Sequence, residues 1–231
     1  MERWSAATGY LVIVFGMAGA LFERGGPPAG ASGEQLLAFV STYRRELLPQ
    51  SLMFVFGAAA YLWFFAALRT TLARSGESST LATVAFGAGV VAVLLQLLLQ
   101  ILQLAMATAG PGIGSGVAGL FGSLMWNVSV AAYVPLAIMF AAVWIATRRE
   151  HVFPPWLGWL SGATAMAHLI MSFGLVVRAG PLAPGGALTY GLYAMSLAWL
   201  LAATTLMVFQ NQSTPMSRAP GSGEPPRLED P

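Results

Sequence analysis

The chain has 231 residues, of which 57% are hydrophobic and only 9% are charged. Soluble domains carry about 25% charged residues, so this composition excludes an ordinary soluble protein and indicates an integral membrane protein. The formal net charge of +2 is too small and too scattered to indicate a nucleic-acid partner. The chain has no cysteine and only two histidines, which excludes thiolate chemistry and leaves little for a metal site.

Hydropathy predicts six helical spans, each long enough to cross the hydrocarbon core of a bilayer. Their approximate ranges are 5–22, 50–68, 82–107, 120–146, 156–177 and 187–209. We therefore expect an all-α fold, an integral membrane bundle formed by residues 1–210. The tail from 211 to 231 is rich in proline, glycine, serine and charge, and we expect it to be disordered.

The arginines predict the orientation of this bundle, because cytoplasmic connections carry an excess of basic residues. With the N-terminus inside, seven of the 11 arginines lie on the inner side and four on the outer side. The inner ones are Arg3, Arg69, Arg74, Arg148, Arg149, Arg218 and Arg227, and the outer ones are Arg24, Arg44, Arg45 and Arg178. We therefore expect a multi-pass protein of the cell membrane with both termini in the cytoplasm. Ala18-Gly19-Ala20 resembles a signal-peptide cleavage site, but Glu2 offsets Arg3 and the apolar stretch is long, so we expect the first span to be retained.

The first outer connection contains a pattern typical of a short amphipathic helix. Ser32 is a good helix start, with Glu34 in the first turn. Apolar residues then recur at helical spacing, at Leu36, Val40, Tyr43 and Leu47. This helix is predicted to lie on the outer interface or to cap the bundle, and Pro49 is predicted to separate it from the second span.

The third predicted span carries three glutamines on one face. At about 100° per residue, Gln96, Gln100 and Gln103 fall within an arc of about 60°. The same face continues through the small residues Gly89, Ala92, Ala107 and Gly110. An unpaired amide in hydrocarbon is costly, so this face must meet protein or water rather than lipid. Two interpretations stay open: the amides bond across a helix–helix interface, or they line a polar cavity.

Further polar residues lie within the fourth and fifth predicted spans. Asn127 precedes Pro135, which removes a backbone donor and should free the Ala131 carbonyl. His168 is the only ionisable group deep within any predicted span, and it shares a helix face with Ser172. These residues either bond to a neighbouring helix or complete the same polar cavity as the glutamines.

Two other features of the fifth span bear on packing and on lipids. Gly158 and Gly162 form a small-xxx-small pattern, which permits close helix contact within the chain or between two copies of it. Just before this span, Arg148, Arg149 and His151 are expected to anchor the topology, or to hold anionic lipid head groups.

The residue types that the predicted spans do not contain narrow the possible functions further. No predicted span carries an Asp or Glu away from its ends, so ion-coupled transport would depend on His168 alone. No catalytic motif, paired carboxylate or cofactor site is recognisable, so we expect no enzyme and no cofactor.

Several segments resemble a family of small six-helix bacterial membrane proteins of unknown function, common in actinobacteria. The segments are Pro155-Trp156-Leu157-Gly158-Trp159-Leu160, Leu62-Trp63-Phe64 followed by Leu68-Arg69, and the outer helix around Leu36–Leu48. The resemblance extends over residues 3–209. It implies the six-helix fold and its topology, and it implies no activity.

Three classes of function follow. The first is a non-enzymatic membrane protein whose Gln, Asn and His faces lock the bundle or build a small polar cavity for a neutral or lipid-like ligand. The second is an uncoupled channel, or a transporter of small solutes or lipids. The third is a sensor or assembly partner that uses the tail. Membrane lipids are the expected partners in each case, and a second copy of the chain is a candidate.

Overall fold

The computed structural model describes residues 2–23, 30–74, 79–177, 180 and 187–210, so the predicted disordered tail lies outside the described residues. Within that part of the chain the fold is all-helical, with no strand. The helices are α1 (Glu2–Leu21), α2 (Gly33–Ala73), α3 (Ser79–Ala109), α4 (Ser115–Ala131), α5 (Tyr133–Glu150), α6 (Pro155–Ser172) and α7 (Ala187–Gln210). Two short 3₁₀ turns, η1 (Gly110–Gly112) and η2 (Phe173–Leu175), follow α3 and α6.

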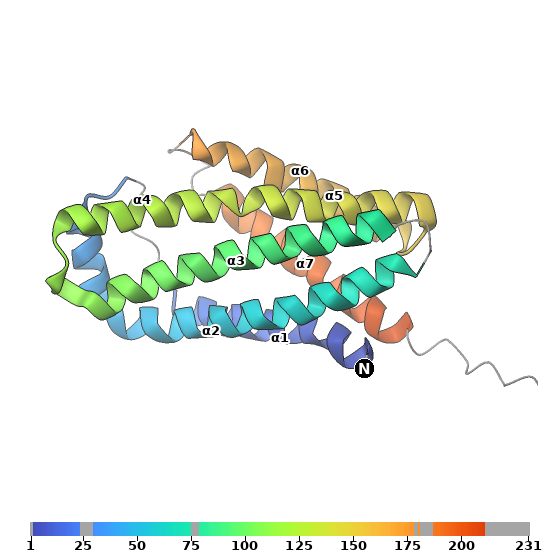
Figure 1. Cartoon of the computed structure of the whole chain (residues 1–231), viewed down its shortest axis with the longest axis horizontal. Helices are drawn as coiled ribbons and strands as arrows, with labels where there is room; N and C mark the ends of the chain where they lie inside the picture. The colour runs from blue at the N-terminus through green and yellow to red at the C-terminus, as the bar shows by residue number, and fades with distance from the viewer. Residues whose placement is uncertain (1, 24–29, 75–78, 178–179, 181–186, 211–231) are drawn as a thin grey trace, which may run out of the picture.

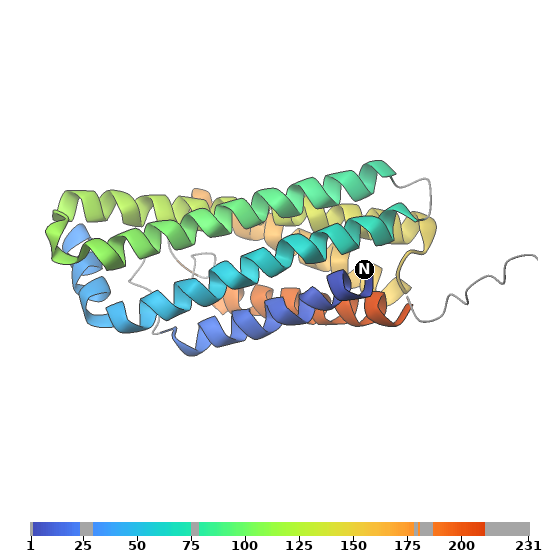
Figure 2. The ribbon, with the colours of Figure 1, turned by 60° about the horizontal axis from the view of Figure 1, so that its bottom comes forward.

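The helices form one elongated bundle (Figure 1). Packing runs from α1 to α2, α3, α5, α6 and α7, and α7 returns to α1, so these segments close a ring. The start of α1 and the ends of α2, α5 and α7 lie at one end of the bundle, which we call the Arg148 end (Figures 1 and 2). The turn between α3 and α4 lies at the opposite end, which we call the Ser115 end.

Apolar side chains cover much of the outer surface, as a lipid environment requires. On α3, for example, Val91, Leu94, Leu98 and Ile101 recur at helical spacing and are all exposed. Five helical stretches are long and apolar enough to cross a membrane: Trp4–Leu21, Gly33–Ala73, Ser79–Ala109, Ser115–Glu150 and Leu188–Phe209. Helix α6 is not among the five. It has only 18 residues, and these include a proline, hydroxyl groups and a histidine that lower its mean hydropathy.

Helix α2 differs from the sequence prediction. The outer amphipathic helix and the second span were expected as separate segments divided at Pro49, but the two helical parts of α2 meet at a kink at Tyr43, and Pro49 lies inside the second part. The distortion lies one to two turns earlier, at Tyr43 (φ −106°, ψ 17°), before the carbonyl that Pro49 leaves without a donor.

The first part of α2 caps the bundle at the Ser115 end. Ser32 and Gln35 form a reciprocal capping box, with backbone-to-side-chain bonds of 2.9 and 3.3 Å. Leu36, Val40 and Leu47 are buried with Met106 and Ala107 of α3. The apolar face predicted from the sequence therefore packs against protein, and a Cβ added at Gly122 of α4 would collide with Leu36.

The fourth predicted span is broken in the middle. Helices α4 and α5 are interrupted at Ala132, three residues before Pro135, and the two together extend over 36 residues. At about 1.5 Å per residue, that length of about 54 Å far exceeds a hydrocarbon core of about 30 Å. Helices α2, α3 and α4–α5 thus extend further toward the Ser115 end than α1 and α6 do (Figure 1).

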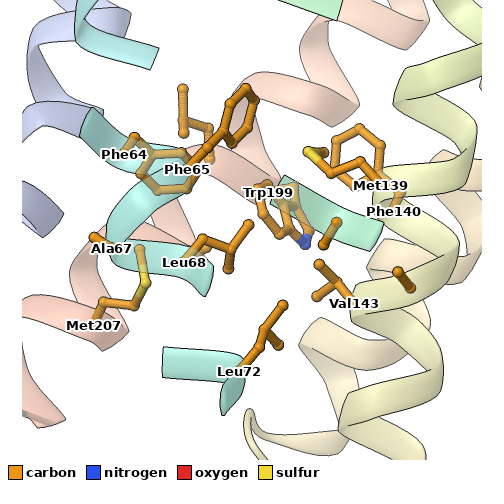
Figure 3. Close-up of a cluster of buried hydrophobic side chains, with 14 of the residues drawn as sticks. Phe64, Phe65, Ala67, Leu68, Leu72, Met139, Phe140, Val143, Trp199 and Met207 are labelled. Carbon is orange, nitrogen blue, oxygen red and sulfur yellow. The ribbon is translucent and has the colours of Figure 1, made fainter. Parts of the chain in front are cut away.

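Large side chains fill the centre of the ring toward the Arg148 end. Trp199 of α7 is 1% exposed and lies between Phe64 of α2 and Phe140 of α5 (Figure 3). Its ring meets theirs edge-on, with centroid distances of 6.1 and 4.9 Å. Its Nε1 donates to Ser161 Oγ on α6 at 2.7 Å, so one side chain joins four helices.

Candidate functional site

The glutamine face of α3 is turned toward α2. Gly89, Ala92, Gln100 and Ala107 are buried along this face. A Cβ added at Gly89 would lie 2.7 Å from the Phe65 ring of α2, so the two helices approach closely there. The small residues on this face therefore allow the amides to reach α2.

Gln103 forms the polar link between these helices. Its Nε2 donates to Gln50 Oε1 at 3.1 Å and to Ser51 Oγ at 2.9 Å. Gln50 is 7% exposed and Ser51 is fully buried, so both bonds lie in a region with little access to solvent. We call Gln50, Ser51, Gln100 and Gln103 the amide cluster.

The amide cluster lies near the level at which α1 ends. Gly19 of α1 lies against the Phe54 ring, at 2.8 Å for an added Cβ, and α1 finishes two residues later. Ser51 is less than one turn of α2 beyond Phe54. Gln96 lies about 10 Å further along α3, at about 1.5 Å per residue, toward the middle of the bundle.

The three glutamines have different surroundings. Gln100 is 3% exposed, and its Oε1 is buried with no hydrogen-bond partner. Gln96 is half-buried and makes no side-chain hydrogen bond with any residue that the structure describes. Only Gln103 therefore acts as an interhelical bond, while Gln100 presents an unsatisfied acceptor that would cost about 1–3 kcal/mol if it stayed dry.

His168 is buried in a separate place, where α6 packs on α5. It is 2% exposed, and its Nδ1 donates to the Thr164 carbonyl of its own helix at 2.8 Å. Because a carbonyl only accepts, Nδ1 carries the hydrogen of this bond. The imidazole packs against Tyr133 and Phe140 of α5, with centroid distances of 5.8 and 5.2 Å.

The structure does not join His168 to the glutamines. Helix α3 packs on α2, α4 and α5, whereas α6 packs mainly on α5 and α7, so α5 lies between the two sites. Asn127 is half-buried on α4. Ser172 donates to the Leu169 carbonyl of its own helix at 2.6 Å. The six polar residues grouped from the sequence therefore do not line one common site.

Gly158 and Gly162 both face α5. A Cβ at Gly158 would lie 2.9 Å from Thr147 Cγ2, and one at Gly162 would lie 3.2 Å from the Trp144 ring. The structure thus uses the small-xxx-small pattern for contact within the chain.

Sequence reasoning missed the partners of Gln103. Gln50 and Ser51 follow Pro49 at the start of the predicted second span, where polar residues are ordinary and attract no notice. The second part of α2 buries them instead. The Trp199–Ser161 bond was missed too, because nothing in the sequence relates these two positions.

The amide cluster can offer only neutral hydrogen bonds. It holds amides and a hydroxyl, with no carboxylate, imidazole or thiol, so it lacks a general base that would activate the hydroxyl. Among the described residues, no group of three His, Cys, Asp or Glu side chains is placed to hold a metal ion. Comparisons with family models, curated proteins and solved structures found no match.

Proposed function

We propose that the chain is a non-enzymatic, multi-pass integral membrane protein whose buried polar side chains hold its helices together. The observation that carries this proposal is the pair of hydrogen bonds from the Gln103 amide to Gln50 and Ser51, which occupy groups that a transport path would leave free. The packing around Trp199 supports it as well, because a solute moving along the bundle axis would have to displace that side chain.

We place six spans in the membrane, with α6 as the sixth. The support is its two-sided pattern: its buried serine, threonine and histidine side chains face the bundle, whereas Met166, Leu169 and Ile170 are exposed. Polar groups directed inward and apolar groups directed outward are what a span within a bundle requires. Six spans also agree with the resemblance to small six-helix bacterial membrane proteins, and membership of that family is part of the proposal.

We place the Arg148 end in the cytoplasm of a cell, with both termini there. Exposed arginines gather at this end: Arg69 in α2, Arg74 just after it, and Arg148 and Arg149 in α5. The positive-inside tendency favours this side for the cytoplasm.

The test of the polar lock is the Gln103→Leu substitution. Leucine fills a similar volume but leaves Gln50 and Ser51 without their donor, so we expect a loss of about 1–2 kcal/mol in the free energy of unfolding. The measurement is unfolding by SDS titration of the protein in mixed micelles, followed by circular dichroism.

Gln96→Leu is the matched control, because it makes the same change on the same face two turns away, where no hydrogen bond is lost. We expect it to leave stability unchanged or to raise it. Equal losses for the two variants, or no loss for Gln103→Leu, would contradict the lock.

The second candidate is an uncoupled channel or a transporter of small solutes. The buried and unpartnered Oε1 of Gln100 favours it, because such an atom is best satisfied by water or by a small hydrogen-bond donor. Uptake of glycerol and urea into proteoliposomes and into empty liposomes distinguishes the two functions. Equal rates are expected for the first proposal, and faster uptake with the protein would replace it with the second.

A further inference from the structure

Basic and aromatic side chains meet at the Arg148 end, where α5 finishes and α6 begins. We call this set the α5–α6 rim; it consists of Arg148, Arg149, His151, Trp156 and Trp159. All five are exposed, and the two tryptophans are 54% and 58% exposed. His151, with a left-handed backbone (φ 55°), ends α5 and starts the short turn that returns the chain into α6.

Arg148 is held in place within this rim. Its guanidinium carbon lies 5.1 Å from the centroid of the Trp159 ring, which is a cation–π distance. A guanidinium over an aromatic ring keeps N–H groups that can donate to another acceptor. Contact of α5 with α6 at Gly158 fixes the two helices beside each other, so the stacked geometry rests on a packed backbone.

Within the described residues, no ion pair is formed by the two arginines of the rim, Arg148 and Arg149, although Glu150 follows them directly in the sequence. Two adjacent guanidinium groups, one of them held on an indole ring, can donate several hydrogen bonds to one phosphate.

The tryptophans indicate where such a phosphate would come from. Exposed Trp156 and Trp159 lie one turn apart at the start of α6, as tryptophans do at the level of lipid head groups. A free phosphate ion would use the arginines alone, whereas a lipid would also place its acyl chains against the two rings. We infer that the α5–α6 rim binds the head-group phosphate of an anionic lipid as a discrete site.

The alternative role of these arginines is general anchoring at the membrane interface. The chain contains a second pair of adjacent arginines against which the two roles can be compared. Arg44 and Arg45 are also adjacent and exposed, and they lie toward the Ser115 end on α2. Neither forms an ion pair or a cation–π contact with any residue in the described ranges. General attraction by charge would therefore act equally on both pairs, whereas a built site would be confined to the rim.

The experiment is a lipid titration of the full chain in detergent, followed by native mass spectrometry, with phosphatidylglycerol and phosphatidylcholine as probes. We expect the wild-type protein to retain one phosphatidylglycerol in preference to phosphatidylcholine. Arg148→Gln/Arg149→Gln should weaken that binding about thirtyfold, since a basic residue near an anionic lipid contributes about fivefold in affinity. Trp159→Leu should weaken it about twofold to fivefold through the lost cation–π contact.

Arg44→Gln/Arg45→Gln should leave the retained phosphatidylglycerol within twofold of wild type. An equal loss in the two double variants, or equal retention of the two lipids, would overturn the discrete site. Inorganic phosphate in tenfold molar excess over the lipid should leave the bound lipid in place. Displacement of the bound lipid by phosphate would indicate a simple anion site and would contradict the lipid site.

Discussion

At the scale of one residue, the approach of α1 to its neighbours depends on the missing side chain of Gly9. A Cβ there would collide with Thr204 Oγ1 of α7 and would lie 3.0 Å from the Phe64 ring of α2. Gly9 is buried where α1 meets both helices. In a membrane, where lipid is as apolar as a side chain, such close approach is a main source of helix association.

We therefore expect Gly9→Ala to lower the free energy of unfolding by about 1–3 kcal/mol, the usual range for overpacking. Gly16→Ala provides the comparison, because an added Cβ there meets nothing within 4 Å. That change should leave stability the same or raise it by up to about 1 kcal/mol through helix propensity. Unfolding by SDS titration measures both, and a Gly9→Ala protein as stable as the Gly16→Ala protein would show that α1 is held in another way.

The three glutamines of α3 show that the identity of a side chain does not determine its role in the bundle. Their common helix face follows from their spacing alone, and burial of that face agrees with the cost of exposing amides to lipid. Their roles differ because α2 presents Gln50 and Ser51 at the level of Gln103 only. No property of α3 by itself could distinguish Gln103 from Gln100.

At the scale of one element, α2 shows how local signals can be correct and still be combined wrongly. The helix start at Ser32 is confirmed by its capping box. The position of the division is wrong, because the two helical parts of α2 meet at a kink at Tyr43 and Pro49 lies inside the second part. Each signal acts over about one turn, whereas the first part of α2 packs on α3 and α4, which lie far along the chain from it.

Helix α6 shows the opposite case, in which composition alone does not decide whether the helix crosses the membrane. Its hydroxyl groups and histidine lower its hydropathy, yet these side chains satisfy themselves at short range: Ser161, Thr164 and His168 each bond to a carbonyl one turn earlier. A polar side chain bonded within its own helix is much less costly in lipid than its hydropathy value implies.

At the scale of the whole molecule, the order of the helices predicts on which side of the membrane each connection lies. If α6 crosses the membrane, then Ser115 and Val176 lie on one side, and Thr70 and His151 lie on the other. All four residues are exposed, and the chain contains no cysteine, so single substitutions can be labelled cleanly.

We expect a membrane-impermeant maleimide to label Ser115→Cys and Val176→Cys on intact cells, and to label Thr70→Cys and His151→Cys only after lysis. A labelled Ser115→Cys beside an unlabelled Val176→Cys would mean that α6 does not cross. Reversal of all four results would place the termini outside.

The sequence by itself determined that the protein is helical and apolar, which stretches form the long apolar helices apart from the breaks at Tyr43 and Ala132, and which face of α3 must avoid lipid. These are local properties, set by composition, periodicity and the need to pair every backbone group within hydrocarbon. Only the tertiary structure decided which helices are neighbours, that Gln103 bonds to Gln50 and Ser51, and that α5 separates His168 from the glutamines. Such pairings join residues far apart in the chain, so they depend on the packing of the whole bundle rather than on the pattern within any one helix.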